Sequence, residues 1–188
     1  AGRDDDMERD RFTWDARFDL NAPWADHVKT VIAAQRAKSR QVGTSVRNTL
    51  PLRVRDNRYG ERTWQAGLQA DKLLKSGDWA HRLTYGYDYV RSSIDNLYTG
   101  LAPLPPEVFP LKRFPDTRET THALYLQDES VLGDWSLTPG LRLDHFALDV
   151  TSQAGFYPPA SEPGKSLSGS ALSPKFGLLY RATPAWTL

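Results

Sequence analysis

A basic segment is the clearest candidate for binding chemistry in this 188-residue chain. It carries eight cationic side chains, namely Arg36, Lys38, Arg40, Arg47, Arg53, Arg55, Arg58 and Arg62. Only Asp56 and Glu61 oppose them. Guanidinium groups present N–H donors in a fixed fork, so they suit carboxylate and phosphate groups. We expect Arg53, Arg55 and Arg58 to attract an anionic ligand; the alternatives are that the segment binds lipid phosphates at a membrane surface or is simply solvated.

Two tyrosines complete the set of candidate ligand-binding residues. Tyr98 and Tyr157 lie at or in long segments between predicted strands, where their rings could contact a flat hydrophobic ligand. Tyrosine is also an ordinary residue of the aromatic girdle at a membrane interface, and that alternative stays open for both.

The histidines and serines offer little catalytic chemistry. His27, His81, His122 and His145 fall within or beside predicted strands, so we expect structural roles rather than metal ligation. The serines clustered in residues 166–173 have no nearby histidine and no nucleophile motif. The absence of cysteine excludes a thiol nucleophile and a cysteine-ligated metal. We expect neither an enzyme nor a resident cofactor.

Composition limits the elements that can position these residues. Lys and Arg number 24 against 23 Asp and Glu, which argues against a nucleic-acid-binding protein that relies on bulk positive charge. The apolar runs are only a few residues long, whereas a membrane-spanning helix needs about 20. If the chain crosses a membrane, strands must do so.

Alternating polarity predicts those strands. From Arg11 to Leu20, apolar and polar residues alternate without a break, as they do in a strand with two different faces. The pattern returns along the chain, which favours an antiparallel, all-β fold. The expected strands are 10–20, 27–40, 60–73, 79–92, 117–129, 135–150 and 171–180, with an eighth that begins at Trp186.

The predicted connections alternate in length. Short turns (NAPWAD, LKSGD, SVLGD and ATPA) lie at one end of the strands, and longer segments at 41–59, 93–116 and 151–170 lie at the other. A Trp closes each short turn, at positions 24, 79, 135 and 186, as in an interfacial aromatic girdle. This asymmetry favours an outer-membrane β-barrel over a soluble β-sandwich that binds or adheres, which stays as the alternative.

The polar face predicts a wide barrel. It carries many charges, including Arg11, Asp71, Asp88 and Arg142, which do not fit the packed interior of a small barrel. Seven strands and the start of an eighth would also leave two open edges. We therefore expect a section of seven to eight strands from the middle of a larger transmembrane barrel.

Four segments resemble TonB-dependent outer-membrane receptors. They are HRLTYGYDYV (residues 81–90), FPDTRETTHALYLQDES (114–130), WSLTPGLRLDHF (135–146) and ALSPKFGLLYRATPAWTL (171–188). The stretch that begins at Phe114 is similar, more narrowly, to the haem and haemoglobin receptor branch. The resemblance covers residues 60–188 well and 1–59 loosely.

That resemblance implies a 22-stranded barrel in the Gram-negative outer membrane, closed by a plug domain and energised by TonB. It implies uptake of haem, free or from a carrier protein, as transported ligand, with a ferric siderophore as the alternative. Lipopolysaccharide and outer-membrane lipid are further expected partners. The plug and the haem-branch boxes Phe-Arg-Ala-Pro and Asn-Pro-Asn-Leu do not occur in this sequence. We therefore expect residues 1–188 to be the central part of the barrel, without plug or remaining strands.

Overall fold

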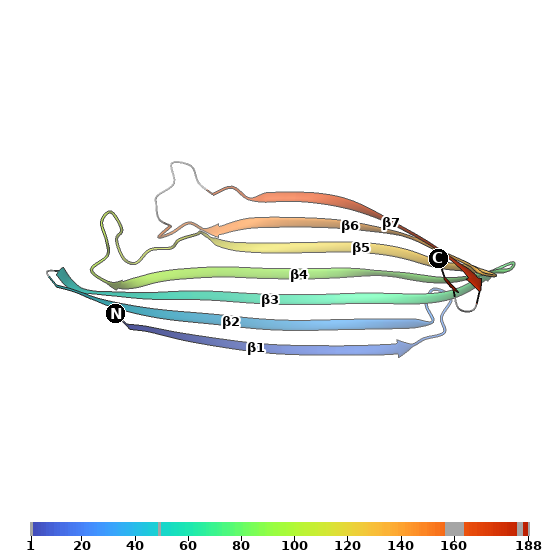
Figure 1. The fold of residues 1–188 in the computed structure, drawn as a ribbon, viewed down its shortest axis with the longest axis horizontal. Coiled ribbons are helices and arrows are strands. Elements are labelled where there is room, and N and C mark those ends of the chain that lie inside the picture. Colours follow the sequence, from blue (N-terminus) through green and yellow to red (C-terminus); the bar gives the residue numbers. More distant parts are fainter. Residues whose placement is uncertain (1, 49, 157–163, 184–185, 188) are drawn as a thin grey trace.

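A single antiparallel sheet makes up the part of the chain that the computed structural model describes, residues 2–48, 50–156, 164–183 and 186–187. Each strand pairs with its neighbours in sequence (Figure 1). The strands are β1 (Gly2–Asp19), β2 (His27–Arg47), β3 (Leu50–Ser76), β4 (Trp79–Leu101), β5 (Asp116–Leu132), β6 (Trp135–Ser152), β7 (Leu167–Thr183) and β8 (Trp186–Thr187). The prediction of an antiparallel, all-β chain is confirmed, and among the described residues the sheet does not close on itself.

Every predicted strand is present, but each of the first seven extends further than predicted. The largest error concerns residues 41–59, which we expected to form a long loop. In the structure β2 and β3 stay paired from His27 opposite Asp71 to Arg47 opposite Leu50. A 27-residue strand such as β3 is about 90 Å long, whereas a tilted strand crosses a bilayer with about 9–11 residues. This hairpin therefore extends far beyond a membrane.

The pairing register assigns every strand residue to one of two faces, because directly opposed residues share a face. Phe12 pairs with Ala34, which pairs with Trp64, and Leu126 pairs with Leu141. We name the face that carries this apolar band the outer face and the opposite one the inner face. The band includes Phe12, Trp14, Val28, Ile32, Trp64, Leu68, Tyr85, Tyr87, Leu124, Leu126, Leu141, Leu143, Leu172 and Phe176.

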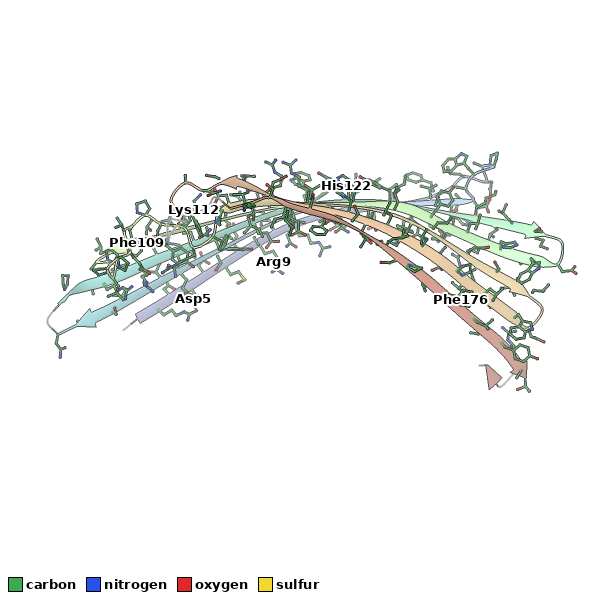
Figure 2. The ribbon with its side chains drawn as sticks, turned by 90° about the horizontal axis from the view of Figure 1, so that it is seen from above. Asp5, Arg9, Phe109, Lys112, His122 and Phe176 are labelled. Carbon is green, nitrogen blue, oxygen red and sulfur yellow. The ribbon has the colours of Figure 1, made fainter. Side chains whose placement is uncertain are left out.

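The apolar band is not covered by a second layer. Figure 2 shows one curved sheet with side chains on both faces, and the small buried cluster of Ala25, Val28 and Ala70 lies near the short turns. Phe12 and Phe176 of the band are 63% and 71% exposed. A β-sandwich would bury such a band between two sheets, so this architecture favours a lipid-facing surface over the sandwich alternative. No described helix is long and apolar enough to span a membrane.

The inner face is polar and ion-paired at mid-strand. The Arg142 guanidinium lies 3.0 Å from Asp144 Oδ1 and 3.1 Å from Asp88 Oδ2. Asp144 is on the same strand, β6, and Asp88 is on β4, on the other side of β5. It also lies 5.8 Å from the centroid of the Tyr125 ring. Paired charges of this kind are expected on a wall that faces water, and they confirm the predicted separation of polar and apolar side chains.

The short turns hold the predicted tryptophans at one end of the sheet. Trp24 lies in the β1–β2 turn, while Trp79, Trp135 and Trp186 begin β4, β6 and β8. Tyr85 Oη donates a hydrogen bond to the Trp24 carbonyl at 2.5 Å, which ties this turn to the sheet. The Trp186 side chain lies outside the described residues. For the other three, the common layer at the turn end is confirmed.

Candidate ligand site on the inner face

The candidate arginines separate between the two faces. Arg53 and Arg55 lie on the inner face, because odd-numbered positions of β3 share the face of Gln65 and Gln69. Arg58 is at an even position and lies on the outer face. The structure therefore brings together two of the three arginines that we expected to act as one group.

A connecting segment folds onto this end of the inner face. β4 continues past the end of its pairing with β5 at Ile94, and Leu111 of the 102–115 segment takes the vacant edge. Tyr98 N donates to Leu111 O at 2.8 Å, and Leu111 N donates to Tyr98 O at 2.9 Å. The buried Asn96 side chain donates to Phe114 O at 2.7 Å and accepts from Arg113 N at 2.8 Å. The segment is thus fixed to β4 by backbone and side-chain hydrogen bonds.

Glu107 joins this segment to the arginines of β3. One carboxylate oxygen lies 3.1 Å from Arg55 Nη2 and 3.9 Å from Arg53 Nη2, and the other accepts a hydrogen bond from Arg113. The hydrogen bond from Arg113, and the charges of Arg113 and Arg55, hold the pKa of Glu107 below its usual value despite the opposing effect of burial. The four residues Arg53, Arg55, Glu107 and Arg113 form what we call the inner cluster.

The inner cluster has the chemistry of an anion site. Three guanidinium groups surround one carboxylate, which leaves an excess of positive charge at the loop end of the inner face. The Arg55 and Arg113 side chains are 38% and 37% exposed, so part of each remains accessible to a ligand. The Arg113 guanidinium also lies 5.6 Å from the centroid of the Tyr98 ring. Carboxylate, phenolate and phosphate groups would all suit this arrangement.

Two residues of this cluster were missed in the sequence. Glu107 and Arg113 lie in a Pro-rich stretch, 52 to 60 residues from Arg53 and Arg55, and no local spacing connects them. Their proximity depends on how the 102–115 segment folds. Tyr98, which we expected at or in a long connection, lies instead within β4, where its ring is next to Arg113. Tyr157, the other predicted tyrosine, lies outside the described residues.

Arg58 belongs to a separate ion-paired group on the outer face. Its guanidinium lies 3.0 Å from Asp56 Oδ2, and the Arg40 guanidinium lies 2.8 Å from the same oxygen. Asp56 lies well beyond the apolar band, and these two hydrogen-bonded arginines lower its pKa to about 2. Arg58 is therefore held by a neighbouring carboxylate and directed away from the inner cluster.

The histidines make local contacts with polar neighbours. His27 Nδ1 is 2.6 Å from Asp19, His81 Nδ1 is 2.8 Å from Asp128, His122 Nδ1 is 2.6 Å from the Tyr87 hydroxyl, and His145 Nδ1 is 2.9 Å from Ser170. Asp128 and Ser130 both contact the same nitrogen of His81, an arrangement that does not connect a serine nucleophile to a base and an orienting acid. Within the described ranges, no group of three or more metal-binding side chains is present.

Comparisons with known proteins agree with this geometry. A family model described as "TonB dependent receptor-like, beta-barrel" matches residues 1–188. Similar solved structures include the ferric citrate transporter FecA, with 22% identity, a TM-score of 0.66, and coverage of 96% of this chain and 26% of that one.

Two further solved structures share the fold at lower identity. The copper transporter OprC has 13% identity and a TM-score of 0.68, with 95% of this chain and 28% of that chain covered. BauA, the ferric preacinetobactin receptor from Acinetobacter baumannii, has 15% identity and a TM-score of 0.64, with coverages of 95% and 29%. The chain therefore spans between a quarter and a third of the length of each of these three proteins.

Proposed function

Because this chain belongs to the TonB-dependent receptor-like β-barrel family of the Gram-negative outer membrane, we propose that it forms part of a receptor that takes up an anionic ferric chelate. The observation that carries the proposal is the excess of guanidinium over carboxylate groups in the inner cluster. An inner-face site at the loop end is exposed to the outside of the cell in such a barrel. Oxygen atoms of a citrate or siderophore complex could accept hydrogen bonds from Arg55 and Arg113.

The similar structures favour a ferric chelate as the ligand class. FecA is a ferric citrate transporter and BauA is a ferric preacinetobactin receptor, by their published descriptions. Haem uptake was our first prediction, and it depends on the resemblance of the stretch that begins at Phe114. The family match does not extend to the haem branch. Haem propionates could occupy the same arginines, so haem is the second candidate.

We also propose that the remaining parts of the transport machinery lie outside residues 1–188. The chain corresponds to 26–29% of the length of the solved structures compared above, which supports its assignment as one section of a larger barrel. A plug domain would then close the lumen and contact TonB. In this arrangement the inner cluster captures the ligand, and transport depends on the plug.

The test compares inner-face and outer-face variants of the full-length receptor. Ligand affinity is measured by quenching of tryptophan fluorescence with ferric citrate, a ferric catecholate siderophore and haem. Charge-assisted hydrogen bonds contribute about 1.5–3 kcal/mol each, so Arg55→Gln and Arg113→Gln should each weaken binding of the preferred chelate by about 10- to 100-fold.

Arg58→Gln is the matched control, because it removes the same charge on the outer face. It should leave affinity unchanged. Equal weakening by Arg58→Gln, or no effect of the two inner variants, would contradict the proposed site. Tight binding of haem with no binding of either chelate would replace the ferric chelate with haem as the ligand.

A further inference from the structure

A small pocket lies on the inner face next to the inner cluster, on the side toward the short turns. Two cross-strand rows from β2, β3 and β4 line it, namely Gln41, Asn57 and Tyr98 in one row and Ser39, Tyr59 and Asn96 in the next. Phe114 of the 102–115 segment lines it as well. Arg55 is the next inner-face residue of β3 after Asn57, so the pocket and the inner cluster are adjacent.

The pocket presents aromatic surface beside a cation. The rings of Tyr59 and Phe114 meet edge to face, with centroids 6.4 Å apart and an interplanar angle of 65°. The backbone of Phe114 is held in place because the Asn96 side chain donates to its carbonyl oxygen at 2.7 Å. Tyr98 lines the pocket and also lies 5.6 Å below the Arg113 guanidinium. An aromatic ring would find suitable packing partners here.

One polar atom in the pocket lacks a partner. The Asn57 side-chain oxygen Oδ1 is buried, and within the described ranges it accepts no hydrogen bond. A buried acceptor without a donor is uncommon in folded proteins. A hydroxyl group or an amide N–H on a bound molecule would supply the missing donor.

The size of the pocket limits what enters it. Its volume is about 150 Å³. An engineered protein cavity of about that volume holds one benzene molecule, so a single six-membered ring fits and a porphyrin macrocycle does not. Successive inner-face positions of a strand are about 7 Å apart, which places the charged substituents of such a ring near Arg55. The best-fitting occupant is therefore an aromatic ring that carries its own anionic oxygen atoms.

We propose that this pocket, which we name the ring pocket, binds one aryl group of the transported ligand, and that the ligand is a ferric chelate of the catecholate or phenolate type. The proposal rests on the proposed function, because Arg55 and Arg113 must hold the charge of the same chelate. The arginines by themselves suit any anion of the right size. The ring pocket adds selection for an aromatic chelate over an aliphatic carboxylate such as ferric citrate.

The experiment measures binding of a ferric tris-catecholate and of ferric citrate to the full-length receptor by fluorescence quenching. Ser39→Leu fills the ring pocket, and Phe114→Ala removes one of its aromatic walls. Each should weaken binding of the tris-catecholate by about 10-fold or more, since the ring loses its packing, and should leave ferric citrate affinity unchanged. Gln35→Leu, on the same strand and face but outside the pocket, is the matched control and should alter neither affinity.

Heat-modified electrophoretic mobility checks that each variant is folded. Unchanged tris-catecholate affinity in both pocket variants, together with a loss in Arg55→Gln, would overturn the ring pocket and leave the anion site intact. Equal weakening of both chelates by Ser39→Leu would overturn it too, and so would a wild-type receptor that binds ferric citrate as tightly as the tris-catecholate. No effect of Arg55→Gln on either chelate would instead contradict the anion site and the proposed function.

Discussion

Two pairs of arginines from the same basic segment lie on opposite faces of one sheet. Arg53 and Arg55 contact Glu107 and take part in the inner cluster, whereas Arg36 and Arg62 border the apolar band outside. The difference depends on whether a residue is at an odd or an even position of its strand. One basic stretch thus presents cationic groups to both faces of the sheet.

The two regions also differ in how the protein compensates their charge. Inside, a carboxylate from a distant segment holds three guanidinium groups together. Outside, at the end of the apolar band, two guanidinium groups oppose each other with no carboxylate within ion-pair distance among the described residues. The first arrangement fixes a connecting segment to the sheet, and the second leaves two exposed arginine side chains directly opposed. Four predictions test this contrast.

The largest effect is expected from a charge placed within the apolar band. Leu141→Arg should reduce the free energy of folding into lipid vesicles by about 2–4 kcal/mol, because Leu141 lies near the middle of the band on β6. Equilibrium refolding of the full-length receptor in denaturant measures this value. Thr138→Arg, on the inner face of the same strand, should cost much less. If the inner variant is the more damaging one, the two faces have been assigned in reverse.

Removal of the carboxylate from the inner cluster should release the connecting segment. Glu107→Gln removes the negative charge and replaces one acceptor oxygen with an amide NH2 group that cannot accept, so charge-assisted hydrogen bonds of about 1.5–3 kcal/mol each are lost or weakened. A spin label on Val108→Cys, at an exposed position next to Glu107, should become more mobile in the electron paramagnetic resonance spectrum. Asp56→Asn on the outer face is the control and should leave the label unchanged. An immobile label in the Glu107 variant would show that the cluster does not hold this segment.

As pH falls, Glu107 in the inner cluster should be protonated before Asp56, whose ion pairs with Arg40 and Arg58 lie on the outer face. The pKa of Glu107 is lowered in the folded chain, so its contribution is present above the usual value near pH 4.5 and is lost as pH falls through the lowered pKa. The pKa of Asp56, about 2, keeps the Arg40 and Arg58 pairs intact to lower pH. The same Val108 label should therefore gain mobility below about pH 4.5, while a label beside Asp56 should not do so until nearer pH 2. Simultaneous release of both labels would contradict this order.

The smallest effect concerns Arg58. Replacing Arg53 and Arg55 with Gln should slow capture of the anionic chelate at low salt, and much less at high salt, because screening acts beyond about 8 Å at physiological ionic strength. Adding Arg58→Gln to that pair should change the association rate very little, since Arg58 is on the outer face beside Asp56. Stopped-flow fluorescence at two salt concentrations measures these rates. A further large decrease from the third substitution would mean that both faces steer the same ligand.

Local alternation in the sequence determined the strands, their two faces and the end that carries tryptophan. These features could be predicted because side chains alternate with a period of two residues, and because the lipid-facing half of each period is apolar. The same reasoning failed at residues 41–59. Alternation in that hairpin is short and interrupted: Leu50, Leu52 and Val54 alternate with other residues, but Gly43, Asn48 and Pro51 are typical of turns. Its strands are therefore recognised only by their pairing with each other.

The tertiary structure alone decided which charged residues from distant parts of the sequence meet. Glu107 and Arg113 reach Arg53 and Arg55 only because the 102–115 segment returns to the free edge of β4 at Leu111. Likewise, Arg36 and Arg62 are 26 positions apart, and they become direct partners only through the register of β2 and β3. Composition and spacing specify the environment of each side chain by its position in a strand, whereas contacts across the sheet depend on register and on how the connections fold, which are not local properties.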